Sequence, residues 1–255
     1  MKDNQVRMNG MFVFQKYLWY FFSVWFFIGL ILVGFSILPP WLEWANTVFL
    51  FASGLYASCY LWNVLPKGRF IIPFIFFGSI AIESLGTHTG LIFGEYTYEA
   101  DFGLMFLGVP ITMGPAWLSV IGASLAFSKL FSFPHRTIIL VPLFAVWLDL
   151  AIDPVAANVK SYWIWAEGGL YYDIPSQNFL GWYLTALLFA AVISRFEEKA
   201  TIVELERNNQ YLFLMLHILF SFTAFISGLY GVLAVGLSSS ICYLFLRKPH
   251  LSLRR

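Results

Sequence analysis

The sequence predicts an all-α fold, a polytopic transmembrane helical bundle of about eight spans. Of the 255 residues, 60% are hydrophobic and only 11% are charged, whereas about one quarter of a typical soluble domain is charged. Apolar runs of about 20 residues, the length that crosses a hydrocarbon core, recur along the whole chain. Basic residues fall almost entirely between alternate runs. We therefore expect residues 1–255 to form a single integral membrane domain.

The expected spans are bounded by charged residues or by Gly and Pro. They cover residues 17–38, 44–65, 70–93, 104–128, 137–153, 178–195, 210–228 and 230–246. The first run is followed by no small-residue cleavage site, so we expect a span there and not a signal peptide. The last two runs are separated only by Gly228-Leu-Tyr-Gly231, and one long tilted helix is the alternative. The charged segment 195–207 is expected to be a solvated helical extension.

The positive charges favour eight spans over seven, because Lys and Arg gather in cytoplasmic loops. With eight spans, every one of the 15 basic residues except Lys160 falls on one side of the membrane. Seven spans would move the basic residues of the C-terminus, from Arg247 to Arg255, to the opposite side. We therefore expect a multi-pass cell-membrane protein with both termini in the cytoplasm.

Three carboxylates lie within the expected spans, and they are Glu83, Asp149 and Asp153. A charge at a helix centre costs about 2.5–3.5 kcal/mol, so such residues usually face a bundle interior or a polar cavity. Their two spans run in the same direction, and a rise of about 1.5 Å per residue gives the three carboxylates similar depths. We expect these residues to form one catalytic site toward the extracytoplasmic half of the bilayer.

Asp149 and Asp153 are four residues apart and therefore share one helix face. Two neighbouring carboxyl groups in apolar surroundings cannot both ionise cheaply. One of them is expected to carry the proton that a general acid needs. Two structural alternatives remain open. Glu83 would then be a hydrogen-bonding partner between packed helices, and Asp153 would be the N-cap of a helix that begins at Pro154.

Two extracytoplasmic loops, 93–103 and 154–177, combine many aromatic rings with carboxylates. They form either an aromatic belt at the membrane interface or the rim of a cavity. For the cavity, the candidate substrate-binding residues in and beside these loops are Tyr96, Tyr98, Trp163, Trp165, Tyr172, Asn178, Trp182 and His88. A packing role is the alternative for His88, which lies near the end of its helix.

Several classes of protein are disfavoured by their missing motifs. The four scattered histidines cannot hold a di-iron centre, and HExxH, Walker A and Gly-x-Ser-x-Gly sequences are absent. Asp149-x-x-x-Asp153 resembles one acidic motif of a Mg²⁺-dependent prenyltransferase, but a second such motif is missing. We therefore expect no metal, no other cofactor and no nucleic acid. A proton-coupled transporter remains an alternative, although no inverted repeat is visible.

Two blocks of motifs carry a family resemblance. The first contains Glu83-Ser-Leu-Gly86, Gly90-Leu-Ile-Phe-Gly-Glu-Tyr96-Thr-Tyr98, Leu107-Gly-Val-Pro110 and Trp117. The second contains Trp147-Leu-Asp149-Leu-Ala-Ile-Asp153-Pro154, Tyr162-Trp163-Ile-Trp165, Tyr171-Tyr172 and Asn178-Phe-Leu-Gly181-Trp182. Over about residues 70–185, the chain resembles the membrane carotenoid biosynthesis proteins. These include hydratases of the bisanhydrobacterioruberin and γ-carotene type.

The resemblance implies a cofactor-independent carotenoid hydratase, a hydro-lyase that adds water to a terminal isoprenoid double bond. In that chemistry the Asp149/Asp153 pair would supply the proton and Glu83 would handle the water, while aromatic faces would stabilise a carbocation. The implied partners are a lipophilic carotenoid, the lipid bilayer and other carotenoid biosynthesis enzymes. The alternatives are a lycopene-cyclase-like end-group cyclase or isomerase, and a non-enzymatic isoprenoid-binding or transport protein.

Overall fold

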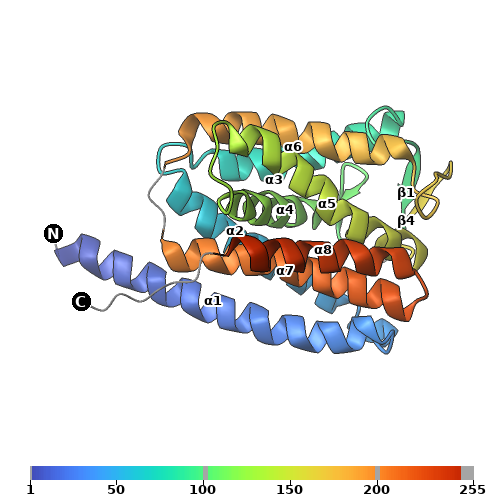
Figure 1. Ribbon diagram of the computed structural model, residues 1–255, viewed down its shortest axis with the longest axis horizontal. Helices are drawn as coiled ribbons and strands as arrows, with labels where there is room; N and C mark the ends of the chain where they lie inside the picture. Colours follow the sequence, from blue (N-terminus) through green and yellow to red (C-terminus); the bar gives the residue numbers. More distant parts are fainter. Residues whose placement is uncertain (1, 100–102, 199–201, 248–255) are drawn as a thin grey trace.

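A computed structural model describes residues 2–99, 103–198 and 202–247, and these residues form eight α-helices (Figure 1). A short 3-10 helix, Pro40–Leu42, precedes the second. The helices are α1 (Lys2–Gly34), α2 (Trp44–Val64), α3 (Ile71–Thr89), α4 (Met113–Ser128), α5 (Arg136–Asn158), α6 (Ser176–Phe196), α7 (Val203–Ile226) and α8 (Tyr230–Leu246). Six of them are long and apolar enough to cross a membrane, while α4 and α8 are shorter. The predicted all-α bundle is confirmed.

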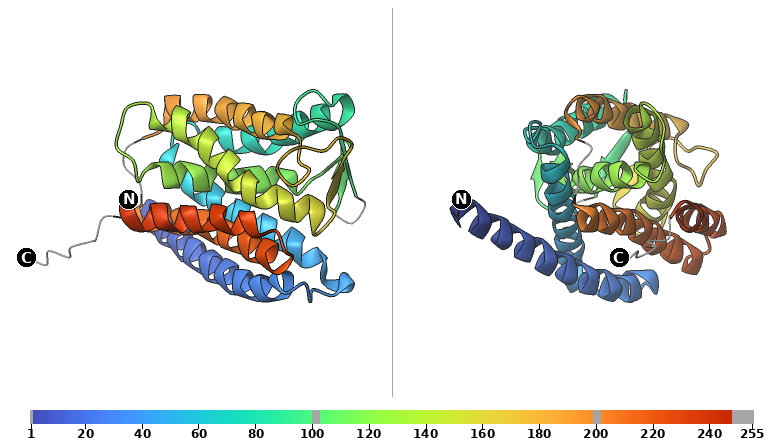
Figure 2. Two further views of the ribbon diagram at one scale, coloured as in Figure 1. Left: turned by 45° about the vertical axis from the view of Figure 1, so that its right-hand side comes forward. Right: turned by 60° about the vertical axis from the view of Figure 1, so that its left-hand side comes forward.

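Helix α4 lies in the middle of the bundle, between α2, α3, α5 and α7 (Figures 1 and 2). All of its residues except Ala116 are buried. Small residues let neighbouring helix backbones come close. At Gly54 of α2 an added Cβ atom would lie 2.5 Å from the carbonyl oxygen of Pro115, so α2 and α4 can approach this closely only with glycine at position 54. With 16 residues, α4 is about 24 Å long. It is therefore shorter than the hydrocarbon core of a typical bilayer, which is about 30 Å thick.

Helix α1 lies at the edge of the bundle, where it packs against α2 and α7. Its N-terminal part extends away from the other helices (Figure 2). Phe22 and Phe26 are buried against the core, whereas Val24, Phe27 and Ile31 are exposed. This is the pattern of a lipid-facing helix with one packed stripe.

The two aromatic loops meet at one end of the bundle. Strand β1 (Tyr96–Tyr98) pairs antiparallel with β4 (Trp163–Trp165), so that Tyr96 lies opposite Trp165 and Tyr98 lies opposite Trp163. We call this end of the bundle the strand end (Figure 1). A second pair of short strands, β2 (Met105–Phe106) and β3 (Val109–Pro110), precedes α4. Residues 100–102 of the first loop lie outside the described residues.

The predicted span 104–128 begins too early, because residues 105–110 form the β2–β3 hairpin and the helix begins only at Met113. Leu107 and Gly108, at the turn of this hairpin, have φ angles of +53° and +76°. A right-handed helix does not accommodate positive φ angles. These two residues therefore keep the segment before Met113 out of α4.

Helix α5 continues through Pro154 to Asn158, so the alternative in which Asp153 caps a new helix is wrong. A proline inside a helix has no N–H to donate to the carbonyl four residues earlier. Here the hydroxyl of Tyr171 donates to that carbonyl, on Leu150, at 2.8 Å. A loop side chain thus replaces the missing backbone hydrogen bond and keeps the helix intact.

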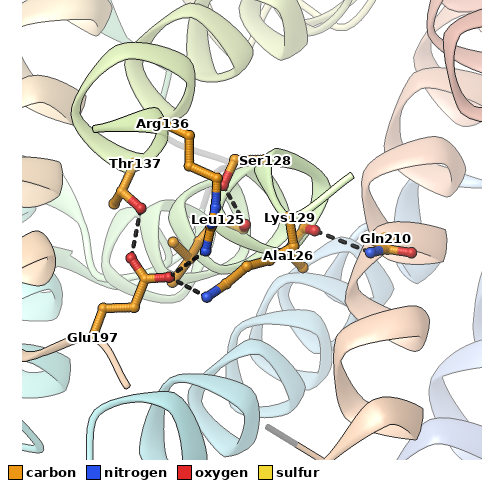
Figure 3. A network of polar contacts seen from close by, with 8 residues as sticks. All are labelled: Leu125, Ala126, Ser128, Lys129, Arg136, Thr137, Glu197 and Gln210. Carbon is orange, nitrogen blue, oxygen red and sulfur yellow. Dashed lines mark hydrogen bonds and ion pairs between the residues drawn. The ribbon is translucent and has the colours of Figure 1, made fainter. Parts of the chain in front are cut away.

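The predicted helix over 195–207 is not continuous, because of its described residues only 195–196 and 203–207 are helical, within α6 and α7. Helix α6 ends at Phe196, and Glu197 has an extended backbone with ψ 126°. Its carboxylate turns inward and accepts hydrogen bonds from Lys129, from Arg136 at 3.1 Å and from Thr137 at 2.5 Å (Figure 3). Only 11% of the Glu197 side chain is exposed. Residues 199–201 lie outside the described part of the chain.

The prediction that the last two apolar runs form separate helices is confirmed, because α7 and α8 are distinct and are joined at Gly228, whose φ is +86°. The charge pattern follows the alternation of the helices. Lys129 and Arg136 lie at the end opposite the strand end, whereas Lys160 lies beside β4. The basic residues Lys199, Lys248, Arg254 and Arg255 fall outside the described residues.

Candidate active site

A cavity of about 310 Å³ lies inside the bundle at the strand end. It is walled by residues of α1, α2, α4, α5 and α7 and is bounded by β1 and β4. The polar side chains of Glu83, Asp153 and Asn178 face it from α3, α5 and α6. Most of the remaining lining is apolar or aromatic. A small number of polar groups in an apolar hollow is the usual composition of a small-molecule site, and the volume lies at the low end of the range of about 300–1,000 Å³ for such sites.

Glu83 accepts three hydrogen bonds from other elements. The hydroxyl groups of Tyr96 and Tyr98 in β1 donate to its Oε2 at 2.6 and 3.1 Å. The indole N–H of Trp117 in α4 donates to its Oε1 at 3.0 Å. An ionised carboxylate is an acceptor on both oxygens, so three converging donors suit that form. Glu83 is 6% exposed, and it joins α3, α4 and β1 at the cavity wall.

Asp149, Asp153 and Asn178 form a second polar group. Asn178, in the first turn of α6, donates from Nδ2 to Asp149 at 2.9 Å and to Asp153 at 2.5 Å. The two carboxyl groups lie four residues apart on one face of α5 and are joined through this amide. Two carboxyl groups so close in apolar surroundings do not both ionise cheaply, and the shared proton stays a prediction. Both carboxyl groups are almost completely buried, at 0% and 1% exposure.

The two aspartates differ in their access to the cavity. Asp153 is part of the lining, whereas Asp149 lies one helical turn behind it and is not. Within the described part of the chain, Oδ1 of Asp149 has no hydrogen-bond partner. Asp153 is therefore the member of the pair placed to touch a molecule in the cavity.

Six of the eight predicted substrate-binding residues line the cavity, and they are Tyr96, Tyr98, Trp163, Trp165, Asn178 and Trp182. The rings also contact one another. The centroids of Trp117 and Trp182 are 4.7 Å apart, and those of Tyr96 and Trp165 are 4.9 Å apart. The aromatic loops thus form part of the cavity wall, as the cavity interpretation requires.

The other two predicted residues lie elsewhere. His88 lines a separate polar cleft, which shares only Tyr96 and Trp165 with the cavity lining. The imidazole Nδ1 of His88 is 2.7 Å from the carbonyl oxygen of Ser84. The hydroxyl of Tyr172 accepts a hydrogen bond from the backbone N–H of Gly231 at 2.8 Å. This hydrogen bond holds the loop that contains Tyr172 against the turn between α7 and α8.

Sequence reasoning missed a polar cluster on the cavity wall that contains Asn46, Lys160 and Tyr162. Lys160 forms an ion pair with Glu43, at 3.5 Å from Nζ to Oε1. Asn46 donates to Glu43 at 2.5 Å and to the Tyr162 hydroxyl at 2.7 Å. Burial, together with the nearby charge of Glu43, raises the pKa of Tyr162, which stays a neutral phenol. The one sequence signal for this cluster was Lys160, which is the single basic residue that the eight-span pattern places on the other side of the membrane.

The site contains carboxylates but no cluster typical of a metal centre. Among the described residues, no group of three or more His, Cys, Asp and Glu side chains is arranged to hold a metal ion. The third partner of the aspartate pair is the amide of Asn178. The geometry is that of two buried carboxyl groups joined through one amide, with a separate, hydrogen-bonded carboxylate that lines the same cavity.

The sequence model of the family described as carotenoid biosynthesis protein matches residues 45–246. This chain belongs to that family. The match extends beyond the predicted core at 70–185 and includes α7 and α8, in which no motif had been recognised. The chain is also 34% identical over 113 residues to the bisanhydrobacterioruberin hydratase of Haloarcula japonica. That match covers 42% of this chain and 38% of the relative. No solved structure matches the chain.

Proposed function

We propose that this chain adds water to the terminal isoprenoid double bond of a linear carotenoid and produces a tertiary alcohol. Membership of the carotenoid biosynthesis family supports the substrate class, and similarity to a hydratase supports the reaction. The observation that carries the proposal is the buried pair of Asp149 and Asp153, which Asn178 joins beside an aromatic, mostly apolar cavity. In this proposal the pair shares one proton.

In the first step, the protonated carboxyl of Asp153 gives its proton to the alkene carbon that bears one hydrogen. A C–H bond forms from the π electrons, and the electron pair of the broken O–H bond stays on Asp153. The carbon with two methyl groups becomes a tertiary carbocation. The amide of Asn178 then donates a hydrogen bond to the new carboxylate of Asp153. Asp149 acts as a positioning residue, because it does not reach the cavity.

The aromatic wall stabilises the cation in the second step. Trp163, Trp165 and Trp182 line the cavity, and the faces of such rings attract positive charge. This attraction is strongest in surroundings from which water has been excluded. The rings therefore lower the barrier to forming the carbocation without reacting with it.

Water completes the reaction on the side of Glu83. The Glu83 carboxylate accepts a proton from a water molecule while the water oxygen bonds to the cation, and the proton returns to the aspartate pair through solvent. Tyr96 and Tyr98 hold Glu83 by hydrogen bonds. Burial, followed by the charge of Glu83, raises the pKa of both hydroxyls, so they remain donors. The substrate neither gains nor loses electrons overall.

We also propose that the acidic site faces the extracytoplasmic half of the bilayer. Lys129 and Arg136 lie at the opposite end of the bundle, and basic residues favour the cytoplasmic side. On this basis, the strand end points away from the cytoplasm.

The test is expression in a bacterium that accumulates lycopene or γ-carotene, with ¹⁸O supplied once as water and once as O₂. We expect a carotenoid that is heavier by one water molecule and whose oxygen comes from labelled water. Oxygen from O₂ would contradict hydration. A product of unchanged mass but altered absorption would indicate the cyclase or isomerase alternative, and unaltered pigment would indicate a binding or transport protein.

A further inference from the structure

The cavity is too small for a whole linear carotenoid. Its volume of about 310 Å³ is at the low end of the range of about 300–1,000 Å³ for sites that enclose a drug-sized ligand, and a linear carotenoid is longer than such a ligand. The remainder of the chain must lie outside. This requirement rests on the proposed function. It means that the polyene must leave the protein through an opening in the cavity wall.

Helix α1 forms the cavity wall on the side away from the acids. Five of its residues line the cavity at helical spacing, and they are Trp25, Ile28, Gly29, Leu32 and Val33. Glu83 and Asn178 belong to α3 and α6, which lie across α4 from α1 (Figures 1 and 2). The cavity therefore extends across the bundle, from the acids toward the edge where α1 lies.

The lining reaches the outer surface at Ile28. This side chain is 50% exposed, whereas every other lining residue is buried or half-buried. The next residue, Gly29, has no atom within 4 Å of the position that a Cβ would take. An exposed isoleucine beside open space marks the place where the cavity and the membrane surface come closest.

Contacts on both sides of this place hold α1 to its neighbours. The indole N–H of Trp25 donates to the carbonyl of Ala45 in α2 at 3.1 Å. Further along α1, a Cβ added at Gly34 would lie 2.6 Å from the ring of Phe222 in α7. The segment around Ile28 and Gly29 lies between these two close contacts. An opening at this segment is therefore compatible with the tight packing of α1 on either side of it.

We propose that the cavity opens to the bilayer beside Ile28 and Gly29 of α1, and that the polyene chain of the substrate passes through this portal while its end group contacts Asp153. The surface around the portal is apolar, because Val24, Phe27 and Ile31 are exposed at 61%, 61% and 55%. A hydrocarbon chain therefore moves from lipid to cavity without crossing water. The portal accepts a linear isoprenoid sideways from the membrane.

Ile28 and Ile31 provide a matched pair for the test. Both are exposed isoleucines on α1, at 50% and 55%, but only Ile28 lines the cavity. We expect Ile28→Trp to lower conversion of a long linear carotenoid by about tenfold or more. Its conversion of an acyclic terpene of about ten carbons, which is smaller than the drug-sized ligands that such cavities enclose, should change less than about twofold. Ile31→Trp should leave both conversions unchanged. Equal activity of the two variants on the long substrate would overturn the portal.

A binding measurement separates the portal from the chemistry. A benzophenone amino acid is placed at position 28 or 31, and the protein is irradiated in vesicles that contain lycopene. More lycopene adduct at position 28 than at 31 is the expected result, and it supports the portal even if no water is added to the pigment. Equal adduct at both positions would overturn the portal even if hydration is observed.

Discussion

Asp153 contacts the cavity while Asp149, one turn earlier on the same face of α5, lies behind it. Both carboxyl groups accept a hydrogen bond from Asn178, and in the proposed mechanism they share a proton. One helix face thus divides a common task between a group that touches the substrate and a group that holds the first in position. Replacing each aspartate should therefore have a different effect.

Asp153→Asn should lower hydration by about 10²–10⁴-fold, because it removes the proton donor. Asp149→Asn keeps an amide in contact with Asp153 and should have the smaller effect. Product formed per unit of membrane-inserted protein is the quantity to measure. If Asp149→Asn abolishes product while Asp153→Asn stays active, the two roles are the reverse of those proposed.

Glu83→Gln should abolish hydration and also destabilise the protein. The amide NH₂ of glutamine would face a donor, Trp117 or one of the two tyrosines, and a lost buried hydrogen bond costs about 1–3 kcal/mol. Tyr98→Phe removes the 3.1 Å bond to Glu83 while the carboxylate stays in place, and it is the control for the structural contribution. Thermal unfolding in detergent and product formation are measured together. A destabilised but fully active Glu83→Gln would support the purely structural role of Glu83.

Glu197 should make stability depend on pH. Burial alone would raise its pKa, but hydrogen bonds from Lys129 and Thr137 and the charges of Lys129 and Arg136 outweigh burial, so the pKa is lowered. A lowered pKa in the folded state stabilises the fold above the unfolded pKa of about 4.3. That contribution is lost as the pH falls through the folded value.

The matched variant for this prediction is Glu197→Gln. It leaves two nearby cations without a counter-ion and should cost about 3 kcal/mol at pH 7. Unfolding temperatures of the two proteins are compared from pH 7 downward. Their difference should shrink once the pH is below about 4. A difference that stays constant over this range would contradict the assignment to the carboxylate charge.

Two glycines should respond in opposite ways to alanine. At Gly54, the new Cβ would lie 2.5 Å from the carbonyl oxygen of Pro115, and such overpacking costs about 1–3 kcal/mol. At Gly29, the Cβ would meet open space, so only the helix preference for alanine remains, about 0.5–1 kcal/mol in favour of the variant. Thermal unfolding in detergent measures both. A stable Gly54→Ala would mean that α2 and α4 separate more easily than their packing indicates.

The orientation of the bundle is open to cysteine labelling. After Cys59 and Cys242 are replaced by alanine, Glu167→Cys at the strand end should react with a membrane-impermeant maleimide in intact cells. Lys67→Cys, at the opposite end, should react only after the cells are broken. The reverse pattern would place the acidic site on the cytoplasmic side.

Run length and charge asymmetry were sufficient to predict the bundle, because these properties follow directly from the cost of placing polar groups in lipid. The spacing of Asp149 and Asp153 likewise predicted that they share one face of a helix. The exact ends of helices depended on distant partners. Pro154 has the sequence pattern of a helix start, but the Tyr171 hydroxyl replaces its missing hydrogen bond and the helix continues through it.

The site shows the same limit. Spacing placed both aspartates on one face, but which of them reaches the cavity depends on how α4, α6 and β4 pack around α5. Likewise, Glu197 belongs to a segment that reads as solvated, and only the folded bundle brings Lys129 and Thr137 to it. Long-range contacts of this kind have no local signature in the chain.

The shortness and burial of α4 bear on how the protein is made. A segment that leaves the translocon alone exposes every side to lipid, and α4 would then present Ser119, Ser124 and Ser128, all of which are buried in the finished bundle. Its length of about 24 Å also leaves it short of a full crossing. Helix α4 on its own would therefore insert poorly into a membrane. Its insertion requires the earlier helices α2 and α3 to be in place first. The later helices α5 and α7 must then pack around it.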